Sequence, residues 1–178
     1  MTAPGEWSGI ADLLRRVPVP VPPGAGPVLG ATDEQIASIA GHYESPLPDV
    51  YVRWLRFCNG TPAGPGGLYG AGTSWDGLDA LRILQRHPCW ATLGWIPVAG
   101  DGNGNTYILD TDAVYFVEAM DESEPAYTAA GSLPVFLRFL LEKELGETRW
   151  PFDAAYVTAA DPGILSVTDS GLLPWLSW

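Results

Sequence analysis

The sequence predicts an α+β fold in which several α-helices pack against a mostly antiparallel β-sheet. Three short apolar runs within residues 95–118 are separated by turn-forming residues, which is the pattern of a β-meander. Segments on both sides of this meander carry apolar residues at helical spacing. The chain has 178 residues, of which 47% are hydrophobic, and this length buries a core without disulfides. We therefore expect one domain over residues 1–178.

The N-terminal region predicts a short amphipathic helix and then a connector. Residues 6–16 carry an apolar stripe at helical spacing, made of Trp7, Ile10, Leu13 and Leu14. Residues 17–30 alternate Pro and Val and include Gly, so they favour an extended connector of polyproline character. We interpret this connector as a spacer; the alternative is a ligand for an aromatic-lined groove.

Three helices are expected between the connector and the meander. Thr32 and Gln35 form the capping-box pattern at the start of the first helix. The second begins at residue 48 or 49 and ends at the Asn-Gly pair of residues 59–60, as at a left-handed C-cap. The third is closed by the His-Pro pair of residues 87–88.

The meander is predicted from the apolar runs 95–99, 106–109 and 113–117. The Gly/Asn/Asp cluster of residues 100–105 tolerates positive φ, so the chain reverses there without strain at Cβ. Leu68-Tyr69-Gly70, in a loop rich in Gly and Pro, predicts a further short strand or turn.

The chain after the meander predicts helices separated by irregular segments. Residues 120–131 are acidic and irregular in pattern. A strong helix is expected over residues 133–145 and a short one over residues 152–160. The last residues, 172–178, place two Trp against the body of the protein.

The charge of the chain excludes one class of partner. A formal net charge of −12 argues against direct nucleic-acid binding, which depends on clusters of Lys and Arg. It favours a basic protein partner, because a surplus of carboxylates speeds encounter with a cationic surface. The alternative is that the acidic surface only keeps the protein in solution.

Cysteine usage and hydropathy predict a cytoplasmic protein without a membrane association. Cys58 and Cys89 lie among apolar residues and are expected to be buried thiols in a reducing compartment. No long uninterrupted apolar run predicts a membrane span, and the N-terminus lacks the pattern of a signal peptide.

No pattern in the sequence predicts an enzyme, a cofactor or a metal. Asp101, Asn103 and Asn105 imitate the first half of a calcium-binding loop, but the expected Gly is Thr106 and the expected Glu is Asp112. We interpret this segment as a hairpin turn whose side chains bond its own backbone. Nucleophile motifs are absent, and the isolated histidines, 42 and 87, are interpreted as helix-end or loop residues.

The order of motifs resembles the SUKH superfamily, which includes the yeast Smi/Knr cell-wall assembly regulators and many bacterial toxin-immunity proteins. The resemblance rests on the segments Leu47-Pro48-Asp49-Val50-Tyr51, Trp54-Leu55, Asn59-Gly60, Leu68-Tyr69-Gly70, Trp95 to Ala99 and Asp101 to Asp110. It covers residues 32–145, which leaves an N-terminal helix and connector over residues 1–31 and a C-terminal extension over residues 146–178.

The resemblance implies a non-catalytic α+β domain that binds another protein. For a bacterial member it implies an immunity protein that neutralises a toxin domain, often a nuclease or a deaminase. The preference for Ala, Gly, Pro, Arg and Trp over Lys and Asn is typical of a bacterial chain. The alternative function is an intracellular regulatory or scaffold module without a toxin partner, and the oligomeric state stays open.

Candidate contact residues are the polar and acidic residues on predicted loops and strand ends. Trp75 is included because a Trp beside an acid in a Gly-rich loop is typical of a binding hot spot, although it can equally plug the end of the sheet. The candidates are Trp75, Asp76, Asp101, Asn103, Asp112, Glu118, Asp121, Glu122 and Glu124.

Overall fold

The computed structural model describes residues 4–19, 30–73, 75, 77–168 and 170–176. Most of the predicted connector and Trp178 lie outside the described residues. The other C-terminal tryptophan, Trp175, is half-buried and packs against the core, as expected.

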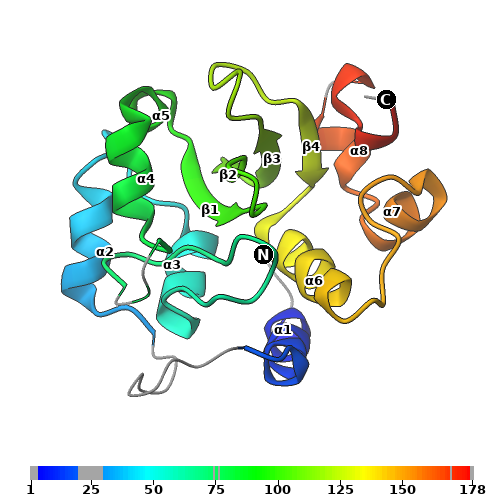
Figure 1. Ribbon diagram of the computed structural model, residues 1–178, viewed down its shortest axis with the longest axis horizontal. Coiled ribbons are helices and arrows are strands. Elements are labelled where there is room, and N and C mark those ends of the chain that lie inside the picture. Colours follow the sequence, from blue (N-terminus) through cyan, green and yellow to red (C-terminus); the bar gives the residue numbers. More distant parts are fainter. Residues whose placement is uncertain (1–3, 20–29, 74, 76, 169, 177–178) are drawn as a thin grey trace.

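A four-stranded antiparallel sheet forms the centre of the protein, with its strands in the order of the chain (Figure 1). The strands are β1 (Ile96–Gly100), β2 (Thr106–Asp110), β3 (Ala113–Val117) and β4 (Tyr127–Ala130). The first three confirm the predicted meander. The expectation of irregular structure over residues 120–131 is wrong for its last part, where β4 pairs with β3 through Tyr127 and Phe116.

A loop of the chain covers the outer edge of β1. Tyr69 donates its backbone N–H to the carbonyl of Val98 at 2.9 Å, and Gly100 donates to Gly67 at 3.0 Å. Leu68 forms an isolated β-bridge with Ala99. The segment of residues 68–70, predicted as a short strand or turn, is not a strand but forms isolated bridges, of which the one between Leu68 and Ala99 lies along this edge.

The C-terminal region covers the outer side of β4. Trp150 donates its indole N–H to the carbonyl of Ala129 at 2.7 Å. The Asp161 carboxylate accepts the backbone N–H of Gly131 at 2.6 Å. Described segments of the chain thus lie along both edges of the sheet.

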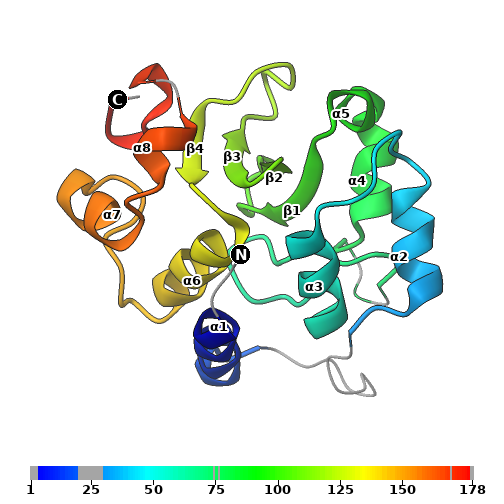
Figure 2. The ribbon, with the colours of Figure 1, turned by 180° about the vertical axis from the view of Figure 1, so that it is seen from behind.

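Eight helices and two short 3-10 turns surround the sheet within the described residues. They are α1 (Pro4–Arg16), α2 (Asp33–Ala40), α3 (Asp49–Phe57), α4 (Ala80–Arg86), α5 (Pro88–Leu93), α6 (Leu133–Glu144), α7 (Ala154–Ala160), α8 (Ile164–Val167), η1 (Ser170–Leu172) and η2 (Pro174–Leu176). Helices α2, α4 and α5 lie on the β1 side of the sheet, and α7 and α8 lie on the β4 side (Figures 1 and 2).

Helix α6 fills the core beneath the sheet. Its apolar face is fully buried, as its spacing predicts. Phe136 packs on Tyr107 of β2 with ring centroids 4.8 Å apart, and Trp150 joins this aromatic cluster at 6.0 Å from both rings. The cluster ties the sheet, α6 and the C-terminal extension together.

Local signals explain where several helices begin and end. Thr32 caps α2 with both hydrogen bonds of the predicted capping box. Helix α3 ends at Phe57 with an extended Cys58, so the expectation that the Asn-Gly pair forms its left-handed C-cap is wrong. Gly60 does have φ of +84°, but it serves the following turn.

On the β1 side of the molecule, the expected helix end at residues 87–88 is confirmed and one expectation about the cysteines is corrected. Pro88 closes one helix and also opens α5, where its missing N–H and fixed φ suit the first helical turn. Cys58 is a buried thiol as expected, whereas Cys89 in α5 is exposed. Burial raises the pKa of the Cys58 thiol to about 12.

Candidate protein-binding surface

The loop between β1 and β2 is organised by the carboxylate of Asp101. This carboxylate accepts hydrogen bonds from the backbone N–H of Asn103 at 2.7 Å and of Asn105 at 3.0 Å. It also accepts the side-chain amide of Asn105 at 2.7 Å. The loop is therefore a turn whose side chains bond its own backbone, as predicted, and Asn103 stands exposed at its tip.

A glycine-rich segment braces this loop from below. A Cβ at Gly66 would lie 2.5 Å from the backbone nitrogen of Gly102 and from the carbonyl carbon of Gly100. Gly102 itself has φ of +84° and stands against the carbonyl oxygen of Pro65. Only glycine permits this approach of two backbones. The segment of residues 65–66 therefore fixes the position of the β1–β2 loop.

The loop between β3 and β4 is fastened to the β1–β2 loop. The side-chain oxygen of Asn105 accepts the backbone N–H of Ala119 at 3.0 Å. Further along, Asp121 accepts both the backbone N–H and the hydroxyl of Ser123. The two loops form one continuous surface at this end of the sheet.

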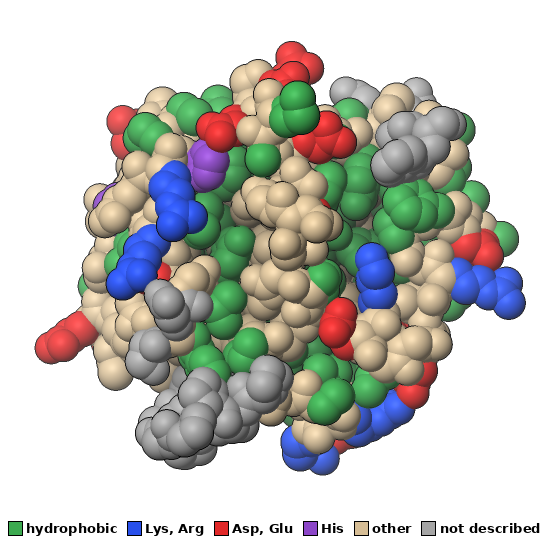
Figure 3. Space-filling model, viewed as in Figure 1, with side chains coloured by type: hydrophobic (Ala, Val, Ile, Leu, Met, Phe, Trp, Pro, Cys, Tyr) green, Lys and Arg blue, Asp and Glu red, His purple; other side chains and the backbone are tan. Residues whose placement is uncertain are grey.

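The antiparallel topology therefore gathers six of the predicted contact residues. We call their surface the acidic end; it consists of Asp101, Asn103, Glu118, Asp121, Glu122 and Glu124. All except Asp101 are exposed. Figure 3 shows acidic side chains at the top of the molecule, where the β3–β4 loop lies in Figure 1.

Helix α5 holds the β3–β4 loop from the side. Trp90 donates its indole N–H to the carbonyl of Glu122 at 3.0 Å. The ring of His87 stacks on Trp90 with centroids 4.2 Å apart, and its Nδ1 lies 2.8 Å from a carboxylate oxygen of Glu122. The sequence places His87 at a helix end, which is correct, but no local signal reveals its contact with Glu122.

Met120 is a further surface residue that sequence reasoning missed. It lies between Glu118 and Asp121 on the β3–β4 loop, and its side chain is 97% exposed. A single exposed apolar side chain is common on protein surfaces, so Met120 is notable here only for its place among the acidic residues of this loop. Its signal in the sequence is a single methionine in an otherwise polar segment.

Buried tyrosines lie close to Asp101 beneath the acidic end. Tyr107 and Tyr127 pack on either side of Phe116, and their hydroxyls are hydrogen-bonded to each other. Burial raises the pKa of Tyr107 to about 12 and raises that of Tyr127 further, and the Asp101 carboxylate acts in the same direction. These hydroxyls stay neutral and serve as packing and hydrogen-bonding groups.

Of the remaining predicted contact residues, the structure separates Asp112 from the acidic end. Asp112 lies on the β2–β3 turn, at the opposite end of the sheet. Trp75 is half-buried and packs against the core, and its backbone N–H donates to the hydroxyl of Thr73 at 3.3 Å. Asp76 lies outside the described residues.

The described residues carry neither a metal-binding cluster nor a helix that could cross a membrane. They contain no group of three or more His, Cys, Asp or Glu side chains arranged to hold a metal ion. None of the helices in the described ranges combines the length and the apolar character that crossing a lipid bilayer requires.

A four-stranded antiparallel sheet surrounded by helices, with an acidic surface on its connecting loops, places the protein in the class of α+β domains with a SUKH-like fold. The model of the SMI1/KNR4 family (SUKH-1) matches residues 30–138, more than half of the chain. The chain therefore belongs to the SMI1/KNR4 family, whose members are generally immunity or regulatory proteins without catalytic activity. A search of curated proteins found no matching relative.

Proposed function

We propose that this chain is a non-enzymatic immunity protein that binds and neutralises a cognate bacterial toxin domain through the acidic end. The observation that carries the proposal is the gathering of Asp101, Asn103 and the four β3–β4 loop acids on two loops that are hydrogen-bonded to each other. Family membership supports a protein partner in general.

The chemistry of the acidic end suits a basic partner. Exposed carboxylates attract a cationic surface over about a Debye length and raise the association rate. Nucleases and deaminases present basic surfaces to nucleic acids, so a toxin of either class is the partner that we propose. The acidic end would cover this basic surface and block access to the active site.

Met120 supplies an apolar contact, which the carboxylates of the acidic end do not. Charge complementarity acts mainly on the association rate, whereas buried apolar anchors slow dissociation. Met120 projects from the middle of the acidic loop and is 97% exposed in the free protein. A methionine adapts its shape to a pocket on the partner.

The bracing of the two loops supports binding without rearrangement. The Asn105–Ala119 hydrogen bond and the contact of Trp90 with Glu122 hold the loops from two sides. A surface that is ordered before binding loses less conformational entropy on association. We therefore propose that the β3–β4 loop keeps its conformation in the complex.

We further propose that residues 1–178 form a single domain that acts in the cytoplasm. The buried position of Trp150 in the core and the contacts of Asp161 with Gly131 support an extension that is part of the same domain.

The test is affinity purification of the tagged full-length protein from its native lysate at low and high salt, followed by mass spectrometry. Immunity predicts recovery of one basic nuclease-like or deaminase-like domain whose yield falls as salt rises. The purified partner must also lose its toxic activity when this protein is added. Recovery of host regulatory proteins instead would favour the alternative, an intracellular regulatory or scaffold module of the same family, and would contradict the immunity proposal.

A further inference from the structure

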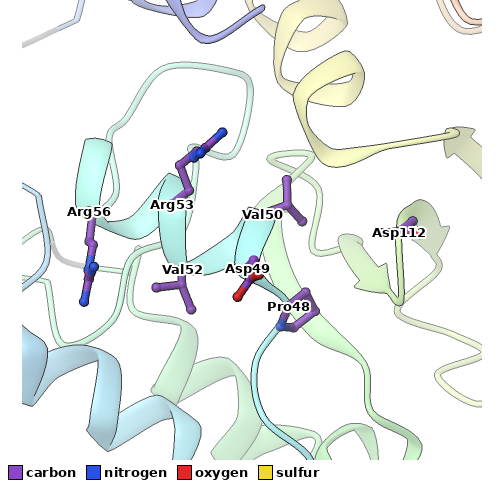
Figure 4. Close-up of a pocket in the computed structure, with 7 residues that line it drawn as sticks. All are labelled: Pro48, Asp49, Val50, Val52, Arg53, Arg56 and Asp112. Carbon is purple, nitrogen blue, oxygen red and sulfur yellow. The ribbon is translucent and has the colours of Figure 1, made fainter. Parts of the chain in front are cut away.

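The end of the sheet opposite to the acidic end carries a surface depression with charges of both signs. It has a volume of about 690 Å³ and lies between α3 and the β2–β3 turn (Figure 4). Its charged lining residues are Asp49, Asp112, Arg53 and Arg56. Arg56 is already paired with Asp33 at 2.9 Å, so these mixed charges select no partner of one sign. Charge of one sign is concentrated at the acidic end instead, where a histidine contacts the β3–β4 loop.

The imidazole of His87 lies between a tryptophan ring and a carboxylate of the β3–β4 loop. It stacks on Trp90 with ring centroids 4.2 Å apart and an angle of 14° between the planes. Its Nδ1 is buried and lies 2.8 Å from a carboxylate oxygen of Glu122. The same glutamate is held a second time, because the indole N–H of Trp90 donates to its backbone carbonyl at 3.0 Å. We call this contact between His87, Trp90 and Glu122 the His87 latch.

The attraction within the His87 latch depends on the charge of the imidazole. Nδ1 and the Glu122 oxygen are close but are not aligned as in a hydrogen bond, so the contact is mainly one between charges. A protonated ring attracts the carboxylate, whereas a neutral ring carries no net charge. The protonated ring also interacts more favourably with the face of the Trp90 indole, whose π electrons attract cations. Both contacts of His87 therefore strengthen when the imidazole gains a proton.

The surroundings of the pair leave histidine as its proton-sensitive member. The side chain of His87 is 19% exposed and that of Glu122 is 44% exposed, so solvent screens this pair less than a fully exposed one. The other titratable or charged groups that adjoin the pair along the chain are Arg86 on α4, Cys89 on α5, and Asp121 and Glu124 on the loop. Among these types of side chain, histidine is the one that changes its charge between about pH 5 and 8.

We propose that the His87 latch is a proton-sensitive fastening of the acidic end: protonation of His87 tightens the attachment of the β3–β4 loop to α5 and offsets the charge of Glu122. As pH falls from about 8 to about 5, the loop becomes more ordered and the net charge of this surface becomes less negative by one. A basic partner then meets a firmer but less strongly attractive surface. Only this effect on binding rests on the proposed function, because the latch itself is a property of the free protein.

The test is NMR spectroscopy of the free full-length protein at a series of pH values between about 5 and 8. Hydrogen exchange of the backbone amides of residues 118–124, relative to the intrinsic exchange rate at each pH, measures the order of the loop. As the ring protons of His87 report its protonation, protection of these amides should rise by about threefold, the effect of one partly exposed ion pair. The indole N–H resonance of Trp90 should shift in the same titration, because this group donates to the Glu122 carbonyl.

Two variants separate the latch from other effects of pH. Glu122→Gln keeps the backbone carbonyl that Trp90 contacts and removes the negative charge at an exposed position, so the fold should be kept. It should abolish the pH dependence of the protection while the His87 ring still titrates. His42→Gln is the matched control, because His42 is exposed after the end of α2, and its loss should leave the pH dependence unchanged.

Each outcome of this experiment decides for or against the latch. Protection that is equal at both ends of the pH range, or that changes equally in the Glu122→Gln variant, would overturn the proposal. Both measurements use the free protein, so a failure of the latch is distinguishable from a failure of the immunity proposal, which depends on recovery of a toxin.

Discussion

The side-chain oxygen of Asn105 accepts a hydrogen bond from the backbone N–H of Ala119 at 3.0 Å and thereby joins the two loops of the acidic end. The same asparagine donates its side-chain amide to Asp101 at 2.7 Å. One residue at the start of β2 thus organises a surface built from two separate connections. Its removal should affect the order of the β3–β4 loop more than the stability of the sheet.

Replacing Asn105 with Ala should loosen the β3–β4 loop and lower the free energy of unfolding by about 1 kcal/mol, because two side-chain hydrogen bonds are lost at a partly exposed site. Hydrogen exchange of the backbone amides of residues 118–124 measures the loosening. Asn103→Ala is the matched control, since the exposed Asn103 takes part in the loop through its backbone N–H. Equal exchange in the two variants would contradict the proposed bracing.

Reversing Asp121, Glu122 and Glu124 to Lys should slow association with a basic partner by about tenfold at low salt and flatten the salt dependence of the association rate. Surface plasmon resonance against the purified partner measures both. The control reverses Asp12, Glu34 and Glu144, which are exposed acids on helices remote in sequence from the β3–β4 loop. If both triple variants slow association equally, net charge and not the acidic end governs the encounter.

Replacing Trp150 with Ala should lower the free energy of unfolding by about 3–5 kcal/mol, because a large buried side chain leaves a cavity and the Ala129 carbonyl loses its donor. Urea denaturation followed by circular dichroism measures this change. Trp175→Ala removes the same side chain from a half-buried position and should cost less. A small effect at Trp150 would contradict the proposal that the C-terminal extension belongs to the same domain.

Gly66→Ala should destabilise the protein by about 1–3 kcal/mol, because its Cβ would meet the backbone of the β1–β2 loop at 2.5 Å. Gly9→Ala should have the opposite effect on stability. Gly9 lies inside α1 with open space at its Cβ, so alanine should stabilise the helix by up to about 1 kcal/mol. Thermal unfolding of both variants gives the comparison, and a neutral Gly66→Ala would show that the loop adjusts its position.

Asp161 should make the protein less stable as pH rises through the acid range. Burial raises the pKa of its carboxyl above the ordinary 3.8, although the backbone N–H groups that it accepts and Arg138 act in the opposite direction. The folded state therefore holds this proton more tightly than the unfolded state does. The resulting stability is fully present below 3.8 and is lost as pH rises through the higher pKa of the folded state.

The variant Asp161→Asn isolates this pH dependence. Its free energy of unfolding, measured in urea at several pH values, should lack the contribution of the Asp161 proton. The free energy of unfolding of the unchanged protein, relative to that of the variant, should therefore fall as pH rises from 3.8. A constant difference across this range would contradict a raised pKa at Asp161.

The sequence predicts those parts of the fold whose signals are local. The capping box at Thr32 and the apolar runs of the meander are short-range patterns, and both are confirmed. β4 escaped prediction because Tyr127-Thr128-Ala129-Ala130 has only four residues and little apolar bulk, so its pairing with β3 decides its structure. Helix α5 escaped because Pro88 predicts a helix end as readily as a helix start.

The sequence predicts the acidic residues of the candidate surface, but it does not predict all of the residues that hold this surface in place. Acidic residues on the β1–β2 and β3–β4 loops meet because these loops lie at the same end of an antiparallel meander. The same topology places the β2–β3 turn, and with it Asp112, at the opposite end. The contacts of His87 and Trp90 with Glu122 join residues that lie 32 or more positions apart in the sequence. A local sequence pattern does not predict contacts between such distant positions.

The covering of both sheet edges has a consequence for how recognition can evolve. Backbone groups on an open edge attract any extended chain, because main-chain hydrogen bonds are the same for every sequence. In the described part of this protein, the bridge at Leu68 and the Trp150 contact already engage the two edges. Partners must then be distinguished by side chains on loops, which can be exchanged singly while the scaffold stays intact. New specificities are thus accessible by small mutational steps, and self-assembly into fibrils through strand addition is disfavoured.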